Sequence, residues 1–307
     1  MILTVTLNTA LDVTYRVPAL VPHTSHRVTD RAERPGGKGV NVARVLAALG
    51  YETVVTGFVG GPTGDRLREL LAPLPRLTDA LVRTEAATRR TLTVVDTAAG
   101  DTTRFDEAGA AVTSGEWTAF RARYAELLPG ATAVALCGSL PPGVHVGAYA
   151  ELIRAARAAG VPVLLDTSGE PLRRGIAARP DLVKPNADEL AGLTGSRDPR
   201  RASQDARRRG AHAVVTSLGP DGLLAATPDG LWQATPPTAV RGNPTGAGDS
   251  VVAALLAGLT DAASWPDRLA RAVALSAATV ASPVAGEYDA AVHAALLPKV
   301  RVTEETP

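Results

Sequence analysis

Short apolar runs alternate with helical segments along most of this sequence, and this alternation restricts the fold more than any other feature. The apolar runs lie at 2–7, 53–59, 133–137, 161–165, 182–183 and 213–216. Helical spacing marks 40–49, 67–71, 117–128, 149–159 and 187–193, and long alanine-rich helices are predicted at 247–259 and 267–281. Because alternating strands and helices form βαβ units, we expect an α/β fold, a three-layer α/β/α sandwich with a mostly parallel central sheet.

Two segments interrupt this alternation. Residues 10–35 show no helical period, and residues 84–106 contain a strand, an Ala-Gly-Asp turn and a second strand, which predict a hairpin. A hairpin does not fit inside a βαβ crossover, so we expect both segments to leave the same edge of the sheet and to pair into a small β-lid. The predicted units are therefore an α/β domain at 1–9, 36–83 and 107–307, and a discontinuous β-lid at 10–35 and 84–106.

Composition argues against several classes of protein. Aromatic residues are 4% of the 307 residues and the net charge is +1, which disfavours a nucleic-acid partner. The basic stretch at 197–209 is interpreted as a solvated helix face. No apolar run approaches the length of a membrane span, no signal-peptide pattern is present, and the single cysteine, Cys137, is expected to be buried. These features favour a cytoplasmic protein with no membrane partner.

The most informative motif is NPTGAGDS at 243–250, which precedes the apolar run VVAALLAGL. Its glycines are expected to form the N-terminal turn of a helix, where the amides of Gly246, Ala247 and Gly248 could bind a phosphate. Asp249 could then orient a hydroxyl beside that phosphate and accept its proton late in a phosphoryl transfer. Alternatively, Asp249 only complements the helix dipole, which is expected to depress its pKa.

A second glycine-rich motif, PGGKGVN at 35–41, opens a predicted helix. Its glycines allow a ligand to approach the backbone closely, and Asn41 could hydrogen-bond sugar hydroxyls. Gly37, Lys38 and Asn41 are therefore candidate substrate-binding residues, although packing alone could require such a turn. The motif is not a Walker A loop, because Gly39 follows the lysine.

Three further motifs follow predicted strands. KPNADE at 184–189 combines a lysine, an amide and a carboxylate, which suit phosphates and Mg²⁺-bound water, although Asn186 and Glu189 also fit a helix capping box. SLGPDG at 217–222 offers a glycine turn where a nucleotide could lie, with a plain turn as the alternative. GSLPPG at 138–143 could present Ser139 to a substrate.

The remaining candidates belong to the predicted lid. Arg89 and Arg104 stand on the two arms of the hairpin, where paired guanidinium groups suit a substrate phosphate, with solvated arginines as the alternative. Asp12, just beyond the first strand, could accept a hydrogen bond from a sugar hydroxyl. The sequence lacks zinc-ligand spacing and a GxGxxG fingerprint, which leaves an NAD-dependent oxidoreductase as the weakest reading.

On these motifs, the chain resembles the PfkB (ribokinase-like) family of carbohydrate kinases over nearly its full length. GGKGVNVARVLAALG at 36–50 matches the family's N-terminal signature, and NPTGAGDSVVAALLAGL at 243–259 matches its C-terminal signature. TLNTALD, GSLPPGV, DTSGEPL, KPNADEL and SLGPDGLL resemble the branch that contains 1-phosphofructokinase, tagatose-6-phosphate kinase and the minor 6-phosphofructokinase.

The resemblance implies a nucleotide-binding α/β/α sandwich whose β-lid often forms a homodimer, with ATP and Mg²⁺ as cofactors. Asp249 matches the family's catalytic base, and Gly246, Ala247 and Gly248 match its anion hole. The positions that match phosphosugar-binding residues are Asp12, Gly37, Asn41, Arg89, Arg104 and Ser139. Those that match nucleotide-binding residues are Lys184, Asn186, Ser217, Gly219 and Gly222. Glu189 matches the acidic residue of the NxxE motif, which acts on Mg²⁺ through bound water.

We therefore expect ATP-dependent phosphoryl transfer to a phosphorylated ketohexose: fructose 1-phosphate, fructose 6-phosphate or tagatose 6-phosphate. Two alternatives stay open. A kinase for an unphosphorylated sugar or a nucleoside would not need the lid arginines. A non-catalytic sugar-phosphate sensor on the same fold would not need intact GAGD and NxxE motifs.

Overall fold

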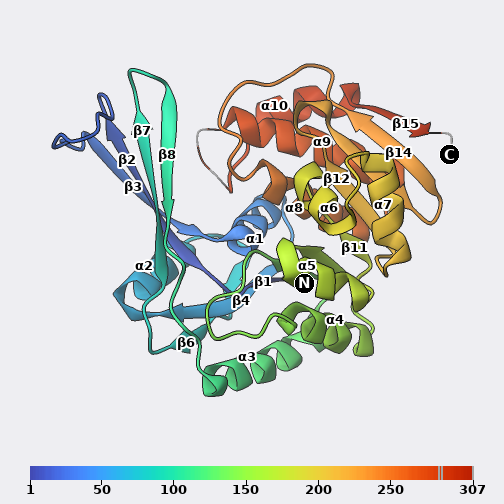
Figure 1. The fold of residues 1–307 in the computed structure, drawn as a ribbon, viewed down its shortest axis with the longest axis horizontal. Helices are drawn as coiled ribbons and strands as arrows, with labels where there is room; N and C mark the ends of the chain where they lie inside the picture. Colours follow the sequence, from blue (N-terminus) through green and yellow to red (C-terminus); the bar gives the residue numbers. More distant parts are fainter. Residues whose placement is uncertain (283, 285, 306–307) are drawn as a thin grey trace.

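The computed structural model describes residues 1–282, 284 and 286–305 (Figure 1). The helices are α1 (Lys38–Ala48), α2 (Gly61–Leu71), α3 (Ser114–Leu127), α4 (Ala148–Ala158), α5 (Gly169–Ala177), α6 (Ala187–Thr194), α7 (Pro199–Arg208), α8 (Ala247–Thr260), α9 (Trp265–Ala281) and α10 (Ala290–Leu296). Short 3₁₀ turns are η1 (Leu128–Gly130), η2 (Gly219–Asp221) and η3 (Leu297–Lys299). The strands are β1 (Ile2–Thr6), β2 (Ala10–Val17), β3 (Asp30–Gly36), β4 (Thr53–Gly60), β5 (Leu77–Asp79), β6 (Val82–Thr84), β7 (Arg89–Asp96), β8 (Asp101–Asp106), β9 (Ala133–Cys137), β10 (Val163–Asp166), β11 (Leu182–Val183), β12 (Ala213–Ser217), β13 (Leu223–Thr227), β14 (Gly230–Thr235) and β15 (Arg301–Glu305).

The central sheet runs in the order β15-β14-β13-β12-β11-β10-β9-β1-β4-β5, and β6 also pairs with β4. The strands from β12 to β5 pair in parallel, as the alternating pattern predicted, although the short strands β5 and β6 were not expected. Beyond β12 the sheet continues with three antiparallel strands, β13 to β15, which were not predicted. A short turn joins β13 and β14, and no helix separates them. The alternation of strands and helices therefore does not predict these strands.

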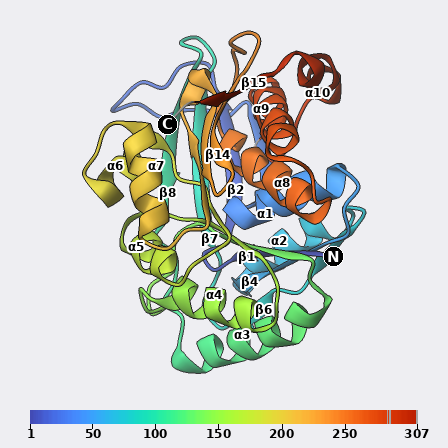
Figure 2. The same cartoon turned by 90° about the vertical axis from the view of Figure 1, so that its right-hand side faces the viewer.

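Helices cover both faces of this sheet, which confirms the predicted α/β/α sandwich (Figure 2). On β1, Leu3 and Val5 face a core shared with α3 to α7, while Ile2 faces a core shared with α1, α8 and α9. Since side chains alternate along a strand, a run that is apolar at successive positions has to be buried on both faces. The buried apolar runs predicted from the sequence have this property.

A second sheet of four strands, in the order β3-β2-β7-β8, projects from one side of the molecule (Figure 1). The predicted hairpin is β7 and β8, which are antiparallel, and β2 pairs in parallel with β7, so the two inserted segments do meet in one sheet. We call this sheet the lid. The domain boundaries stated above remain a prediction.

The start of α1 packs very closely on the end of β1. A Cβ atom on Gly39 would lie 2.7 Å from the carbonyl oxygen of Val5, so only glycine allows the helix to approach the strand here. This contact places Lys38 and Asn41 over the carboxyl end of β1.

Helix α2 begins at Gly61, earlier than predicted, because Pro62 is readily accommodated in a first helical turn.

Two further expectations concern burial and membranes. The Cys137 side chain is fully buried in β9, as predicted. In the part of the chain that the structure describes, no helix is both long enough and apolar enough to span a bilayer.

Candidate active site

A polar cavity of about 750 Å³ lies between the lid and the carboxyl edge of the central sheet. Most of the residues singled out from the sequence line it: Asp12, Gly37, Lys38, Asn41, Arg89, Arg104, Ser139, Lys184, Asn186, Glu189, Ser217, Gly246, Gly248 and Asp249. The other three, Gly219, Gly222 and Ala247, line a second cavity that adjoins the first. The structure therefore brings together motifs that are more than 200 residues apart.

The glycine-rich turn before α8 opens into this cavity. Gly246 is the N-cap residue and adopts the left-handed conformation (φ 85°), which glycine accommodates without strain. The amide of Ser250 is the first to bond back along the helix, to Gly246, and that of Ala247 donates to Pro244. Among the described residues, the amides of Gly248 and Asp249 have no such partner. Two free amides at a helix N-terminus can bind an anion, although Ala247 differs from the expectation that its amide is free.

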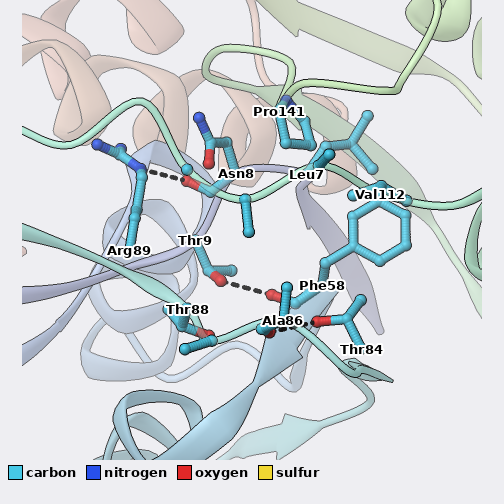
Figure 3. Close-up of a pocket in the computed structure, with 14 residues that line it drawn as sticks. Leu7, Asn8, Thr9, Phe58, Thr84, Ala86, Thr88, Arg89, Val112 and Pro141 are labelled. Carbon is cyan, nitrogen blue, oxygen red and sulfur yellow. Dashed lines mark hydrogen bonds between the residues drawn. The ribbon is translucent and has the colours of Figure 1, made fainter.

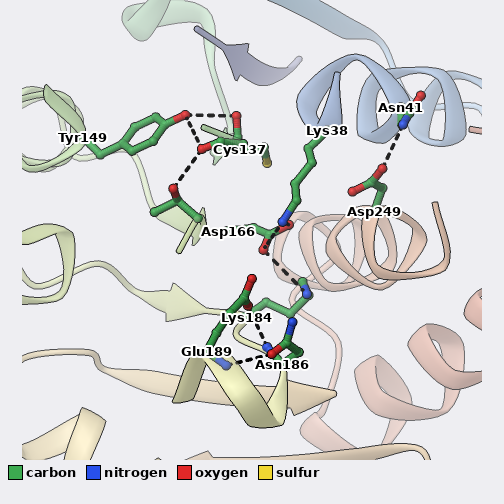
Figure 4. Close-up of polar contacts among 11 residues, drawn as sticks. Lys38, Asn41, Cys137, Tyr149, Asp166, Lys184, Asn186, Glu189 and Asp249 are labelled. Carbon is green, nitrogen blue, oxygen red and sulfur yellow. Dashed lines mark hydrogen bonds and ion pairs between the residues drawn. The ribbon is translucent and has the colours of Figure 1, made fainter. Parts of the chain in front are cut away.

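Asp249 is buried beneath that turn and accepts a 2.9 Å hydrogen bond from the side-chain amide of Asn41 (Figure 4). Burial raises the pKa of Asp249 to about 6, and the nearby charge of Asp166 adds to the rise. Lys38, Lys184 and the Asn41 hydrogen bond act in the opposite direction but do not offset burial. The expectation that the helix dipole would depress this pKa was therefore wrong, because desolvation outweighs the dipole at a buried carboxylate.

Asp166, at the end of β10, was missed as a site residue. Its carboxylate is 1% exposed and lies 3.3 Å from the Lys38 ammonium and 3.6 Å from the Lys184 ammonium (Figure 4). Burial would lower the pKa of Lys38, but the carboxylates of Asp166 and Asp249 hold it above its ordinary value. Lys38 is thus held as a cation, and Lys184 lies against the same carboxylate. An acidic residue directly after a buried apolar strand was the signal available in the sequence.

Asn186 and Glu189 form the capping box that the sequence allowed. The amide of Glu189 donates to the Asn186 side chain at 2.8 Å, and the amide of Asn186 donates to the Glu189 carboxylate at 2.9 Å. Both residues also line the polar cavity. The second carboxylate oxygen of Glu189 is not used by the capping box, so capping and ligand binding are compatible here.

At the lid end of the cavity, Arg89 is held in place by backbone oxygens. Its guanidinium donates to the carbonyl of Asn8 at 3.3 Å (Figure 3) and to that of Glu107 at 3.1 Å. Asp12 lies in the same region, where burial raises its pKa although Arg104 and Arg89 act to lower it. The two guanidinium groups can bind a phosphate, and the Asp12 carboxyl group can hydrogen-bond a sugar hydroxyl. This end of the cavity is therefore suitable for a sugar phosphate.

Ser139 sits in the turn after β9, at 3.1 Å from the side-chain amide of Asn8. Buried hydroxyl groups hold this turn: Tyr149 donates to the carbonyls of Cys137 and Gly138, both at 3.0 Å, and Thr167 donates to Gly138 at 2.8 Å (Figure 4). Asn8 and Tyr149 were not anticipated as supports of the site, because their hydrogen-bond partners are brought close to them only by the fold.

The second cavity, of about 670 Å³, is mostly apolar and shares Asn186, Ser217, Pro244 and Gly248 with the polar one. Its walls include Val240, Val251, Val273 and Val280, together with the glycine turn at 219–222. An apolar cavity that adjoins a polar cavity fits a nucleotide, with the base in the apolar cavity and the phosphates beside Lys184 and the α8 turn.

The fit for a divalent cation is less complete. Among the described residues, no group of three or more His, Cys, Asp or Glu side chains is arranged to hold a metal ion. Glu189 lines the cavity, and the carboxylate oxygen that its capping box does not use suits a magnesium ion that keeps most of its water and is held mainly by phosphates.

Comparison with known proteins yields consistent matches. The model of the pfkB family carbohydrate kinases matches residues 4–290. The 1-phosphofructokinase of Rhodobacter capsulatus is 38% identical over 261 residues, which are 83% of this chain and 82% of that protein. Escherichia coli phosphofructokinase-2 in complex with potassium has a TM-score of 0.92 and 33% identity, covering 97% of this chain and 98% of that one. The complex of that enzyme with fructose-6-phosphate has a TM-score of 0.89 and 33% identity, with the same coverage.

Proposed function

The chain belongs to the pfkB family of carbohydrate kinases, and we propose that Asp249 is the base in its transfer of a phosphoryl group from ATP to a sugar hydroxyl. The enzyme is an ATP-dependent carbohydrate kinase of the 1-phosphofructokinase type, and its acceptor is a phosphorylated ketohexose. The observation that carries the proposal for Asp249 is its position, buried next to free amides of the α8 turn and facing the polar cavity.

The geometry supports a simple division of roles. The amides at the start of α8 and the Lys38 and Lys184 ammonium groups would stabilise negative charge on the transferring phosphoryl group. Asp249, ionised above pH 6, would orient the sugar hydroxyl and take its proton as the bond to phosphorus forms. Asn41 fixes the orientation of that carboxylate through its hydrogen bond.

At the other end of the sugar, the lid residues would provide binding and position. Arg89 and Arg104 would hold the existing phosphate, while Asp12, Gly37 and Ser139 would contact the sugar. Holding the phosphate at a fixed distance from Asp249 restricts which hydroxyl reaches the transferring group. Ser217, Gly219 and Gly222 would contact the nucleotide in the apolar cavity.

Magnesium is the expected cofactor of this reaction and would help to neutralise the negative charge of the phosphates. Glu189 would hold it through water.

ATP is a cytoplasmic metabolite, which favours the cytoplasmic location expected from the sequence.

The substrate is the first point to test. We expect fructose 1-phosphate to have the highest kcat/KM among fructose 1-phosphate, fructose 6-phosphate, tagatose 6-phosphate and ribose, because a 1-phosphofructokinase is among the relatives. A coupled assay of ADP release measures all four. A preference for ribose would contradict the role given to Arg89 and Arg104, and sugar binding without ADP release would favour a sensor.

We also propose that the lid forms a homodimer. On β8, Phe105 lies between Arg104 and Asp106 in sequence, so it points to the face opposite the cavity, where it is 56% exposed. It is paired with Leu92 on β7, which is paired with Val13 on β2, giving an apolar row across that face. One relative, E. coli phosphofructokinase-2, is tetrameric in its inhibited form.

Sedimentation velocity tests the dimer. We expect a dimer for the wild type and a shift toward monomer for Phe105→Glu, because a buried carboxylate at an apolar interface is costly. Val146→Glu is the matched control, since Val146 is an exposed apolar residue away from the lid. A monomeric wild type at micromolar concentration would contradict the proposal.

A further inference from the structure

We infer that Asp106 is an intramolecular competitor of the substrate phosphate: its carboxylate occupies the lid arginines of the free enzyme and weakens the binding of phosphosugars. The inference rests on the proposed function, since it takes Arg89 and Arg104 as the phosphate-binding pair.

The contacts of Asp106 are those expected of a phosphate mimic. One carboxylate oxygen lies 2.9 Å from both Nε and Nη2 of Arg104, and the same oxygen lies 3.9 Å from Nη1 of Arg89. A single anionic oxygen thus stands between two guanidinium groups. Oxygens of a phosphate would seek the same position.

The register of the lid explains why the carboxylate is found there. Asp106 on β8 is paired with Thr91 on β7, and Thr91 is paired with Asp12 on β2, so the three lie in one row across the sheet. Arg104 is two residues from Asp106 and therefore shares its face. All four side chains line the polar cavity, so the pair formed by Asp106 and Arg104 lies inside the site.

The contacts also differ in how firmly they are held. Arg89 is 12% exposed and is fixed by two backbone carbonyls, whereas the Asp106 side chain is 52% exposed and Arg104 is 49% exposed. Asp106 can therefore turn into solvent while Arg89 keeps its place. The charge of Arg104 lowers the pKa of Arg89, although burial is the larger cause, so the two cations repel one another when no anion lies between them.

The competition has a consequence in both directions of the reaction. An incoming phosphosugar has to displace Asp106, which lowers its affinity, and a departing bisphosphate product is replaced by Asp106, which favours its release. Since an exposed ion pair is weak, the effect on affinity should be modest, about two- to fivefold.

The experiment compares Asp106→Asn with the wild type by calorimetry in the absence of ATP. We expect the dissociation constants of fructose 1-phosphate and fructose 6-phosphate to fall by about two- to fivefold, and that of inorganic phosphate to fall in parallel. Asp106→Ala should give the same change. Asp30→Asn is the matched control: it removes one negative charge from the same sheet, where Asp30 lies 3.6 Å from Arg16 and does not line the cavity.

A third variant separates this inference from the proposed function. Arg104→Met should weaken the binding of both phosphosugars and of inorganic phosphate. If Arg104→Met leaves binding unchanged, the phosphate site assigned to the lid is wrong. If Arg104→Met weakens binding but Asp106→Asn leaves it unchanged or weaker, the phosphate site stands and the competitor role of Asp106 is overturned.

Discussion

Replacing Asp249 with asparagine is expected to lower kcat by about 10²- to 10⁴-fold, while KM for both substrates changes only a few-fold. Asparagine has the same shape and can still accept the hydrogen bond from Asn41, but it cannot take a proton from the sugar hydroxyl. Steady-state kinetics with saturating ATP and phosphosugar measure the change. Near-normal turnover would remove Asp249 from the mechanism.

Loss of fold cannot account for this result, because the same substitution should stabilise the protein at neutral pH. The pKa of Asp249 is about 6 in the folded chain, against an ordinary value of 3.8, so the folded state binds the proton more tightly than the unfolded state. Stability therefore falls as pH rises from about 3.8 to about 6, and the penalty persists above that range. Asparagine removes the penalty.

Urea denaturation provides the control measurement. At pH 8 the free energy of unfolding of Asp249→Asn should exceed that of the wild type, by on the order of 2 kcal/mol, and the gain should shrink toward pH 4. An inactive variant that is more stable than its parent identifies a residue kept for function at the expense of stability. A less stable variant at pH 8 would contradict the raised pKa.

Much of the fold could be predicted because the parallel strands other than the short β5 and β6 each carry their own signal. Runs such as 133–137 and 161–165 are apolar at successive positions, and each is followed by a turn and an amphipathic helix. The antiparallel strands β13 to β15 could not be predicted in this way, since they pair through a turn and, in the case of β15, with a segment more than 60 residues away. Pairing over such distances depends on tertiary packing, which a local pattern does not reveal.

The candidate site was predictable at its glycine-rich turns and less so in its electrostatics. The NPTGAGDS and GGKG motifs could be placed at helix starts from the sequence alone, because glycine and proline determine the local backbone conformation there. Asp166 was missed because its importance comes from Lys38 and Lys184, which lie 128 and 18 residues away. The direction of the Asp249 pKa was predicted wrongly for the same reason: burial is a property of the assembled fold.

Lysine is rare in this chain, and Lys38 is one of the few that it has. The chain has three lysines, Lys38, Lys184 and Lys299, and otherwise uses arginine for its positive charges. Two of the three lie against Asp166 at the polar cavity. An ammonium is a compact charge that can approach a phosphate oxygen from one direction, whereas a guanidinium is a wide planar fork. The position of Lys38, between Asp166 and Asp249, thus favours a contact with the transferring phosphate rather than with the sugar.

Lys38→Met is accordingly expected to lower kcat/KM for ATP by about 10²- to 10³-fold, with little change in KM for the phosphosugar, by analogy with the loss of one charge-stabilising donor. The charge of Lys38 lowers the pKa of Asp249. Its removal should therefore shift the acid limb of the pH dependence of kcat from about pH 6 to a higher pH. Lys38→Arg should recover the position of this limb but not the rate, since the charge returns without the geometry. Lys299→Met, which removes the lysine outside the site, is the control and should match the wild type. An increase in KM for the phosphosugar alone would instead place Lys38 at the sugar, and an unshifted acid limb would show that Lys38 does not act on Asp249.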